Sequence, residues 1–201
     1  MNSLTTEQRK KLIEVYPYLL PRNLWTDEVS PDYNYDHIRG EFELPPGWER
    51  LFLLYCMHLK PILMKHNYVD KFRFTQIKEK SGRIRLYDNG APMEAHNLEQ
   101  IFYTLSGGIC EYCGKKAVYE THGWIEVLCK EHVTKQPQWK KHRIKRRRVL
   151  TIERYDYSNS KDGEKFLLKL SITPYWREYT KCLKMSDSEF YEYIINGGKN
   201  S

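Results

Sequence analysis

Apolar side chains recur every three or four residues in four segments of the chain, a spacing typical of amphipathic helices. Thr5 precedes the first segment and Gln8 follows three residues later, which is the pattern of a capping box at a helix start. We therefore expect helices over residues 6–20, 48–66, 92–105 and 175–195.

Two other regions alternate apolar and polar residues, which predicts antiparallel hairpins. The first hairpin joins residues 71–78 to residues 83–87, and a slip of phase inside its first strand predicts a bulge. The second joins residues 149–157 to residues 165–172. Separate runs of helices and hairpins indicate the α+β class.

Cysteine and histidine fall in two short pairs, Cys110 with Cys113 and Cys129 with His132, separated by fifteen residues. A tetrahedral zinc ion needs four nitrogen or sulfur donors, and two pairs at this spacing supply them. Gly114 directly after the first pair permits the tight turn that such a site requires. The spacing predicts a zinc site rather than a disulfide framework.

Four protein donors close the coordination shell of zinc, whereas a catalytic zinc keeps one position open for water. We therefore expect one structural Zn²⁺ ion. His122 lies in the intervening loop and is the alternative to His132 as the fourth ligand. His132 is preferred because Gly123 and Trp124, which follow His122, indicate a packed turn.

The positive charge of the chain is concentrated in residues 135–148, which we call the basic strip. This segment has eight basic side chains and no acidic one, and the rest of the chain has 25 basic and 26 acidic side chains. We expect the strip to be helical beyond Pro137. Its predicted binding residues are Lys135, Trp139, Lys140, Lys141, Arg143, Lys145, Arg146, Arg147 and Arg148.

Lysine and arginine neutralise phosphates, and Trp139 can stack on an unpaired base. The basic strip is therefore predicted to contact nucleic acid, with an acidic protein surface or a merely solvated face as the alternatives. In residues 76–87 cationic side chains alternate with apolar ones. This pattern indicates a half-buried hairpin with a basic solvent face, or an extension of the nucleic-acid surface.

The bulk composition fits a protein with one main core, since 40% of its 201 residues are hydrophobic and 29% are charged. No run approaches the roughly 18 apolar residues of a membrane span, and the first residues lack the apolar core of a signal peptide. Cys56 and Cys182 are interpreted as inert thiols of a reducing compartment. We expect a cytoplasmic protein without membrane contact.

We expect helices packed on short antiparallel hairpins, with an embedded zinc-ribbon or treble-clef-like element. The predicted parts are a helical and hairpin region, a zinc element, a basic segment, and a C-terminal hairpin with a helix that packs with the rest. Their bounds are residues 1–108, 109–133, 134–148 and 149–201.

Residues 10–133 resemble a family of small uncharacterised zinc-binding proteins encoded by bacteriophages and prophages. The matching motifs, in order, are Tyr16-Pro17, Pro21-Arg22, Trp25, Gly47-Trp48, the hairpin sequence QIKEKSGRIRLY of residues 76–87, Cys110-Glu111-Tyr112-Cys113-Gly114, Gly123-Trp124, and Leu128-Cys129 with His132. The resemblance implies a phage accessory protein in the cytoplasm of a bacterial host. It implies no reaction and no catalytic residues.

The leading hypothesis from the sequence is a non-enzymatic, zinc-stabilised protein that binds nucleic acid or a nucleoprotein complex. The alternative is an inhibitor of a host protein, in which the basic strip occupies an acidic surface of the defence or transcription machinery. A metal-dependent nuclease is the third possibility, with His142 in the basic strip as the residue to test. No small-molecule substrate is expected.

Overall fold

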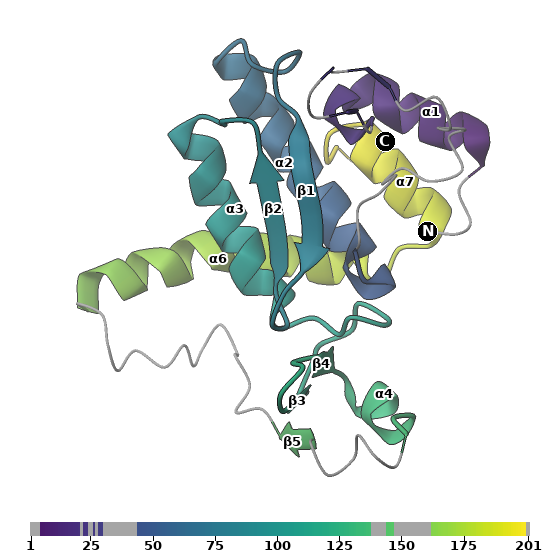
Figure 1. Cartoon of the computed structure of the whole chain (residues 1–201), viewed down its shortest axis with the longest axis vertical. Coiled ribbons are helices and arrows are strands. Elements are labelled where there is room, and N and C mark those ends of the chain that lie inside the picture. The colour runs from purple at the N-terminus through teal and green to yellow at the C-terminus, as the bar shows by residue number, and fades with distance from the viewer. Residues whose placement is uncertain are drawn as a thin grey trace.

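The computed structural model describes residues 5–20, 22–23, 26, 28–29, 44–137, 144–146 and 162–199, with the backbone alone for residues 145–146 and 162–171. Figure 1 shows the arrangement of its elements. The fold combines helices with two small antiparallel sheets, which confirms the α+β class.

The first helix is shorter than predicted, because α1 (Thr6–Val15) ends before Pro17 and a 3-10 turn η1 (Pro17–Leu19) follows. Proline disfavours helical geometry in the residue before it, so Tyr16 is not helical and α1 ends at Val15. The start is confirmed: Thr5 and Gln8 exchange both hydrogen bonds of a capping box.

Helix α2 (Glu49–Lys65), preceded by the 3-10 turn η2 (Pro46–Trp48), forms the centre of the fold, and nine of its residues are buried. The predicted hairpin is confirmed as β1 (Phe74–Glu79) and β2 (Ile84–Asp88), with the predicted bulge between Phe74 and Gln76. Helix α3 (Met93–Ser106) packs against both α2 and β2, as Figure 1 shows.

The predicted strand over residues 165–172 is wrong, because this segment belongs to helix α6 (Asp162–Cys182). Its sequence, EKFLLKLS over residues 164–171, is rich in residues of high helix propensity, so the alternating pattern is overridden. The other predicted strand, residues 149–157, lies outside the described residues.

The predicted helix over residues 175–195 is two helices. Helix α6 ends at Cys182, and α7 (Asp187–Ile195) begins after Ser186. Ser186 and Glu189 form a capping box that fixes this start, so the chain turns between the two helices.

A second, smaller sheet is built from β3 (Tyr119–Thr121), β4 (Val127–Leu128) and β5 (Ile144–Arg146), in the order β4-β3-β5. Both neighbours pair antiparallel to β3. The expectation of helix beyond Pro137 is therefore wrong for residues 144–146, because they add an edge strand to the sheet. The short helix α4 (Lys130–Thr134) follows β4.

Candidate metal centre

Cys110 and Cys113 lie in a tight turn between α3 and β3. The amide of Gly114 donates to the Cys110 carbonyl oxygen at 2.9 Å, and the Cys110 amide donates to the Lys115 carbonyl oxygen at 2.7 Å. Gly114 has a φ of +74°, a conformation that glycine adopts without strain. The predicted role of Gly114 is therefore confirmed. We call residues 110–115 the knuckle.

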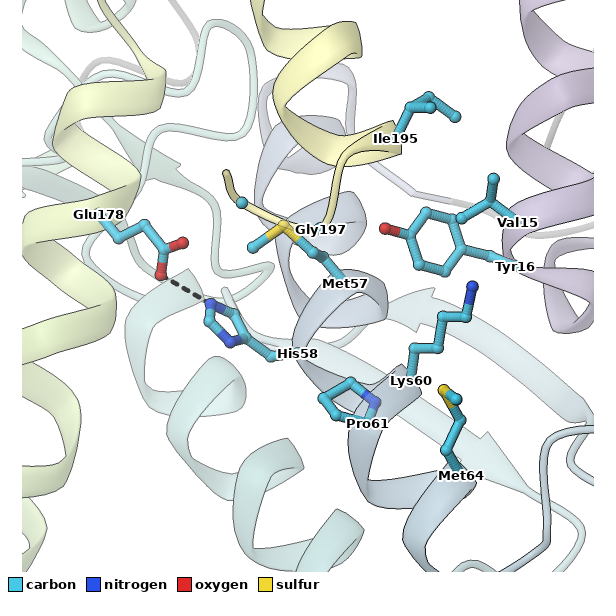
Figure 2. A pocket seen from close by; sticks show the side chains of 11 residues that line it. Val15, Tyr16, Met57, His58, Lys60, Pro61, Met64, Glu178, Ile195 and Gly197 are labelled. Carbon is cyan, nitrogen blue, oxygen red and sulfur yellow. Dashed lines mark hydrogen bonds and ion pairs between the residues drawn. The ribbon is translucent and has the colours of Figure 1, made fainter. Parts of the chain in front are cut away.

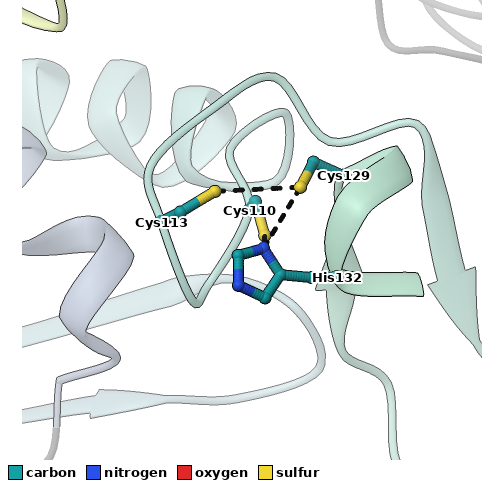
Figure 3. A group of neighbouring side chains, drawn as sticks. All are labelled: Cys110, Cys113, Cys129 and His132. Atoms are coloured by element: carbon teal, nitrogen blue, oxygen red, sulfur yellow. Dashed lines mark hydrogen bonds between the residues drawn. The ribbon is translucent and has the colours of Figure 1, made fainter. Parts of the chain in front are cut away.

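The four predicted ligands converge at one place, where they can bind a metal ion (Figure 3): one ligand atom from each of Cys110, Cys113, Cys129 and His132 lies within 4.8 Å of the others. His132 contributes Nδ1, which lies 3.2 Å from Sγ of Cys129 and 3.7 Å from Sγ of Cys110. The Sγ atoms of Cys113 and Cys129 lie 3.7 Å apart.

These separations fit a tetrahedral zinc ion. Zn–S bonds of about 2.3 Å and Zn–N bonds of about 2.0 Å give tetrahedral edges of roughly 3.8 Å between sulfurs and roughly 3.5 Å between sulfur and nitrogen. His122, the alternative fourth ligand, is exposed and lies outside the cluster. The choice of His132 is therefore the one that the geometry supports.

The thiols differ in acidity. Burial raises the pKa of Cys110 to about 12 and also raises the pKa of Cys113. Burial acts in the same direction on Cys129, but interactions with the backbone and imidazole of His132 outweigh it and lower the pKa of Cys129 to about 7. A divalent cation that replaces the thiol protons would neutralise the buried thiolates, and this would offset the free-energy cost of burying their negative charge.

The knuckle is anchored to the main core from two sides. The Gly47 amide donates to the Glu111 carbonyl oxygen at 2.7 Å, and the Trp48 indole donates to the Ile109 carbonyl oxygen at 2.9 Å. From α6, the Tyr179 hydroxyl donates to the Gly114 carbonyl oxygen at 2.8 Å.

The second ligand pair is held by the small sheet and α4. Cys129 directly follows β4 and caps the start of α4, whose first turn carries His132. The Tyr112 ring stacks on the His132 ring with centroids 5.2 Å apart and planes 11° from parallel. Buried Glu111 accepts a hydrogen bond of 2.8 Å from the Val127 amide, which joins the knuckle to β4.

The structure places three of the predicted strip residues. Lys135 is exposed after α4, and its ammonium group lies 2.7 Å from a carboxylate oxygen of Glu131. The backbone of Lys145 and Arg146 belongs to β5, where they pair with Glu120 and Tyr119. The remaining strip residues, Trp139, Lys140, Lys141, Arg143, Arg147 and Arg148, lie outside the described residues.

A second group of potential ligands was missed from the sequence. One ligand atom from each of Asp88, His96 and Glu99 lies within 4.8 Å of the others. Only His96 and Glu99 could have been paired from the sequence, because residues three apart lie on the same side of a helix. An Asp88 oxygen already accepts hydrogen bonds from the amides of Gly90 and Ala91, so it also closes the turn before α3.

A cavity of about 440 Å³ lies between α1, α2, α6 and the C-terminal end of α7 (Figure 2). At its edge His58 and Glu178 form a hydrogen bond of 2.6 Å, and the Tyr193 hydroxyl donates to the second Glu178 oxygen at 2.6 Å. Burial raises the pKa of Glu178, but the hydrogen bonds with His58 and Tyr193 outweigh it and lower the pKa below its usual value. The three side chains connect α2, α6 and α7.

Two further expectations concern exposure. The packed turn expected around Trp124 is wrong, because 75% of this side chain is exposed at the tip of the β3–β4 hairpin.

Cys56 and Cys182 are buried, and burial raises the pKa of both thiols, that of Cys182 to about 11. A raised pKa disfavours the nucleophilic thiolate, in agreement with inert thiols.

Comparisons of the chain with models of protein families, with curated proteins and with solved structures give no match. In the part of the chain that the structure describes, none of the helices combines the length and the apolar character needed to cross a membrane.

Proposed function

We propose that the chain is a non-enzymatic protein that binds nucleic acid, or a nucleoprotein complex, through the basic strip and with help from the β1–β2 hairpin. One structural Zn²⁺ ion would be held by Cys110, Cys113, Cys129 and His132. The observation that carries the proposal is the pairing of β5 with β3, because it fixes two strip residues to the sheet of the metal centre.

A metal with four protein ligands supports structure rather than reaction. The knuckle, the β3–β4 hairpin and α4 follow one another and supply the two ligand pairs, an order that favours a treble-clef-like form over a zinc ribbon. Such a rigid platform lowers the entropy that the basic strip loses when it binds a partner.

The resemblance of residues 10–133 to phage and prophage proteins supports an accessory role in the cytoplasm of a bacterial host. The basic strip lies beyond the resembling part, so the partner is inferred from charge. An excess of cations without acidic neighbours in the sequence fits a polyphosphate backbone.

Salt dependence tests the proposal. The affinity for a mixed set of DNA and RNA oligonucleotides should fall linearly on a log–log scale with salt concentration. The triple change Lys140→Ala, Lys141→Ala and Arg143→Ala should reduce the slope by about 2 to 3, because up to three phosphate contacts are lost. The metal content should stay unchanged.

A matched control removes the same charge elsewhere. Lys11, Lys65 and Lys199 are exposed in α1, in α2 and after α7, and their triple change to alanine should leave the slope unchanged. Equal slopes for all three proteins would contradict the proposal. If a discrete host protein instead remains bound after nuclease treatment of a lysate, inhibition of that protein becomes the better explanation. Cleavage of the oligonucleotides with added divalent metal would favour the nuclease.

A further inference from the structure

The β1–β2 hairpin presents a cationic face that the structure describes in full. Lys78 pairs with Arg85 across the strands, and Lys80 exchanges two backbone hydrogen bonds with Arg83. Residues directly opposite each other in an antiparallel pair share a face, and so do residues two apart along a strand. The four cations therefore lie on one face.

The opposite face of this hairpin is buried. Ile77, Ile84 and Leu86 are at most 5% exposed and belong to the main core. The cationic face is therefore held in a fixed direction toward the surface, because turning the hairpin over would expose these three apolar side chains.

Two tyrosine rings support the cations. The guanidinium carbons of Arg83 and Arg85 lie 5.7 Å and 4.6 Å from the centre of the Tyr103 ring, and the Lys78 ammonium lies 5.2 Å from the centre of the Tyr87 ring. Nη1 of Arg83 and Nε of Arg85 are buried, so these two guanidinium groups add positive charge to the face from partly covered positions. Lys80 is exposed and Lys78 is half-buried, so their ammonium groups are the ones that a phosphate can reach.

The tip of this hairpin touches the turn that carries Trp124. A methyl group in place of a Gly82 hydrogen would lie 3.0 Å from Cγ1 of Val127 and 3.1 Å from Cγ2 of Ile125. Ile125 directly follows Trp124, whose side chain is 75% exposed. The tip of the hairpin with the cationic face therefore lies next to the turn that presents an exposed indole.

The turn around Trp124 is held by the buried side chain of Thr121. The Thr121 hydroxyl donates to the Trp124 carbonyl oxygen at 2.5 Å and accepts from the Glu126 amide at 2.8 Å. A fixed backbone presents the indole without a further loss of backbone entropy on binding. An indole ring exposed in this way can stack on a base, but only a base outside a duplex offers its whole face.

We propose that single-stranded nucleic acid lies along these two hairpins, with phosphates on the cationic face of β1–β2 and one base stacked on Trp124. The proposal rests on the proposed function and deepens it, since it names the strand state of the ligand and a surface beyond the basic strip. Single strands are favoured over duplexes because cations and an exposed aromatic ring occur together.

The test compares a fluorescein-labelled 20-nucleotide oligothymidine with a 20-base-pair duplex, by fluorescence anisotropy at one salt concentration. The wild-type protein should bind the single strand more tightly. Trp124→Ala should weaken single-strand binding about tenfold to a hundredfold and leave duplex binding unchanged, whereas Trp124→Phe, which keeps an aromatic ring, should retain most of the affinity. Met93→Ala is the matched control, because that apolar side chain is 74% exposed on α3.

The cationic face is tested separately. Lys78→Gln with Lys80→Gln should reduce the salt slope for the single strand by about 1.4, and Lys65→Gln with Lys199→Gln should not change it. Unchanged melting and metal content would establish that the variants are folded.

The outcomes separate the two proposals. If the wild-type protein binds neither oligonucleotide, the proposed function fails and this inference fails with it. If the wild-type protein binds and the basic-strip variant weakens binding, but Trp124→Ala and the Lys78 and Lys80 changes do not, only the inference is overturned. Tighter binding of the duplex than of the single strand would also overturn it.

Discussion

The Tyr179 hydroxyl donates a hydrogen bond of 2.8 Å to the carbonyl oxygen of Gly114, so helix α6 holds the knuckle that carries two of the four potential metal ligands. Both groups are buried, and burial raises the pKa of Tyr179 well above its usual value, so the hydroxyl keeps its proton at any ordinary pH. The metal centre and the C-terminal helices are thereby part of one packed structure.

Tyr179→Phe should therefore lower the free energy of unfolding by about 1–3 kcal/mol, because a buried carbonyl oxygen loses its partner. Metal retention under mild denaturant should fall with it. Tyr191→Phe, at a buried tyrosine of α7, controls for the loss of a hydroxyl and should keep the metal. Denaturant titration with metal release as a second readout measures both effects, and full retention of metal in Tyr179→Phe would contradict the coupling.

Gly47 lies against the knuckle on its other side. A Cβ atom at this position would lie 2.2 Å from the Cys110 carbonyl oxygen and 2.7 Å from the Cys113 amide nitrogen. Since both neighbours are backbone, Gly47→Ala should cost about 3 kcal/mol or more of stability and weaken metal binding. The result would be read from thermal melting and metal content.

Gly197→Ala is the matched control for this change. Its Cβ atom would meet nothing within 4 Å, although the φ of +64° makes alanine unfavourable there. The cost should be about 1–2 kcal/mol, without loss of metal. Equal metal content in the two variants would show that the approach of Gly47 does not matter for the metal centre.

The features that could be read from the sequence are those with strong local signals. The spacing of the two Cys and His pairs identified the four side chains that converge where a metal ion can bind, and Thr5 with Gln8 identified the first helix start. The β1–β2 hairpin was also predicted, because one face of it is buried and its apolar residues alternate accordingly.

Where two periods fit the same residues, the sequence was misleading. In residues 165–172 the apolar side chains alternate, but apolar residues at 166, 167 and 170 also fit one face of a helix, which is what forms. The capping box of Ser186 and Glu189 is a local signal that was missed, so two helices were predicted as one.

Contacts between residues distant in the sequence could not be predicted at all. Nothing local indicates that Gly47 lies against Cys110, or that Gly82 lies against Ile125. The exposure of Trp124 has the same cause, because an aromatic residue beside a glycine fits a packed turn and an open one equally well. Only the packing of the two hairpins decides between them.

Removal of the metal should destabilise the whole fold, because the knuckle is hydrogen-bonded to Gly47 of η2 and to Tyr179 of α6. Cys110→Ser should abolish stoichiometric zinc binding and lower the melting temperature, and excess chelator should have the same effect on the wild-type protein. Cys182→Ala, which changes a buried cysteine outside the cluster, should still bind one zinc per chain. One zinc per Cys110→Ser chain together with unchanged melting would refute the site.

The Glu178 carboxylate predicts how stability depends on pH. When ionised it can only accept hydrogen bonds, so Nε2 of His58 carries the proton in their 2.6 Å contact. Its pKa is lowered in the folded protein, so its stabilising contribution is present above the pKa of the unfolded chain and disappears as the pH falls through the folded value.

Glu178→Gln removes this contribution while it keeps an oxygen that can accept from Tyr193. The variant should be less stable than the wild-type protein at pH 7, and the difference should shrink below about pH 4.3, the ordinary pKa of glutamate. Urea titrations between pH 3 and pH 8 measure the difference, with Glu192→Gln on the exposed face of α7 as a surface control. A difference that stays constant across this range would mean that ionised Glu178 does not stabilise the junction of α2, α6 and α7.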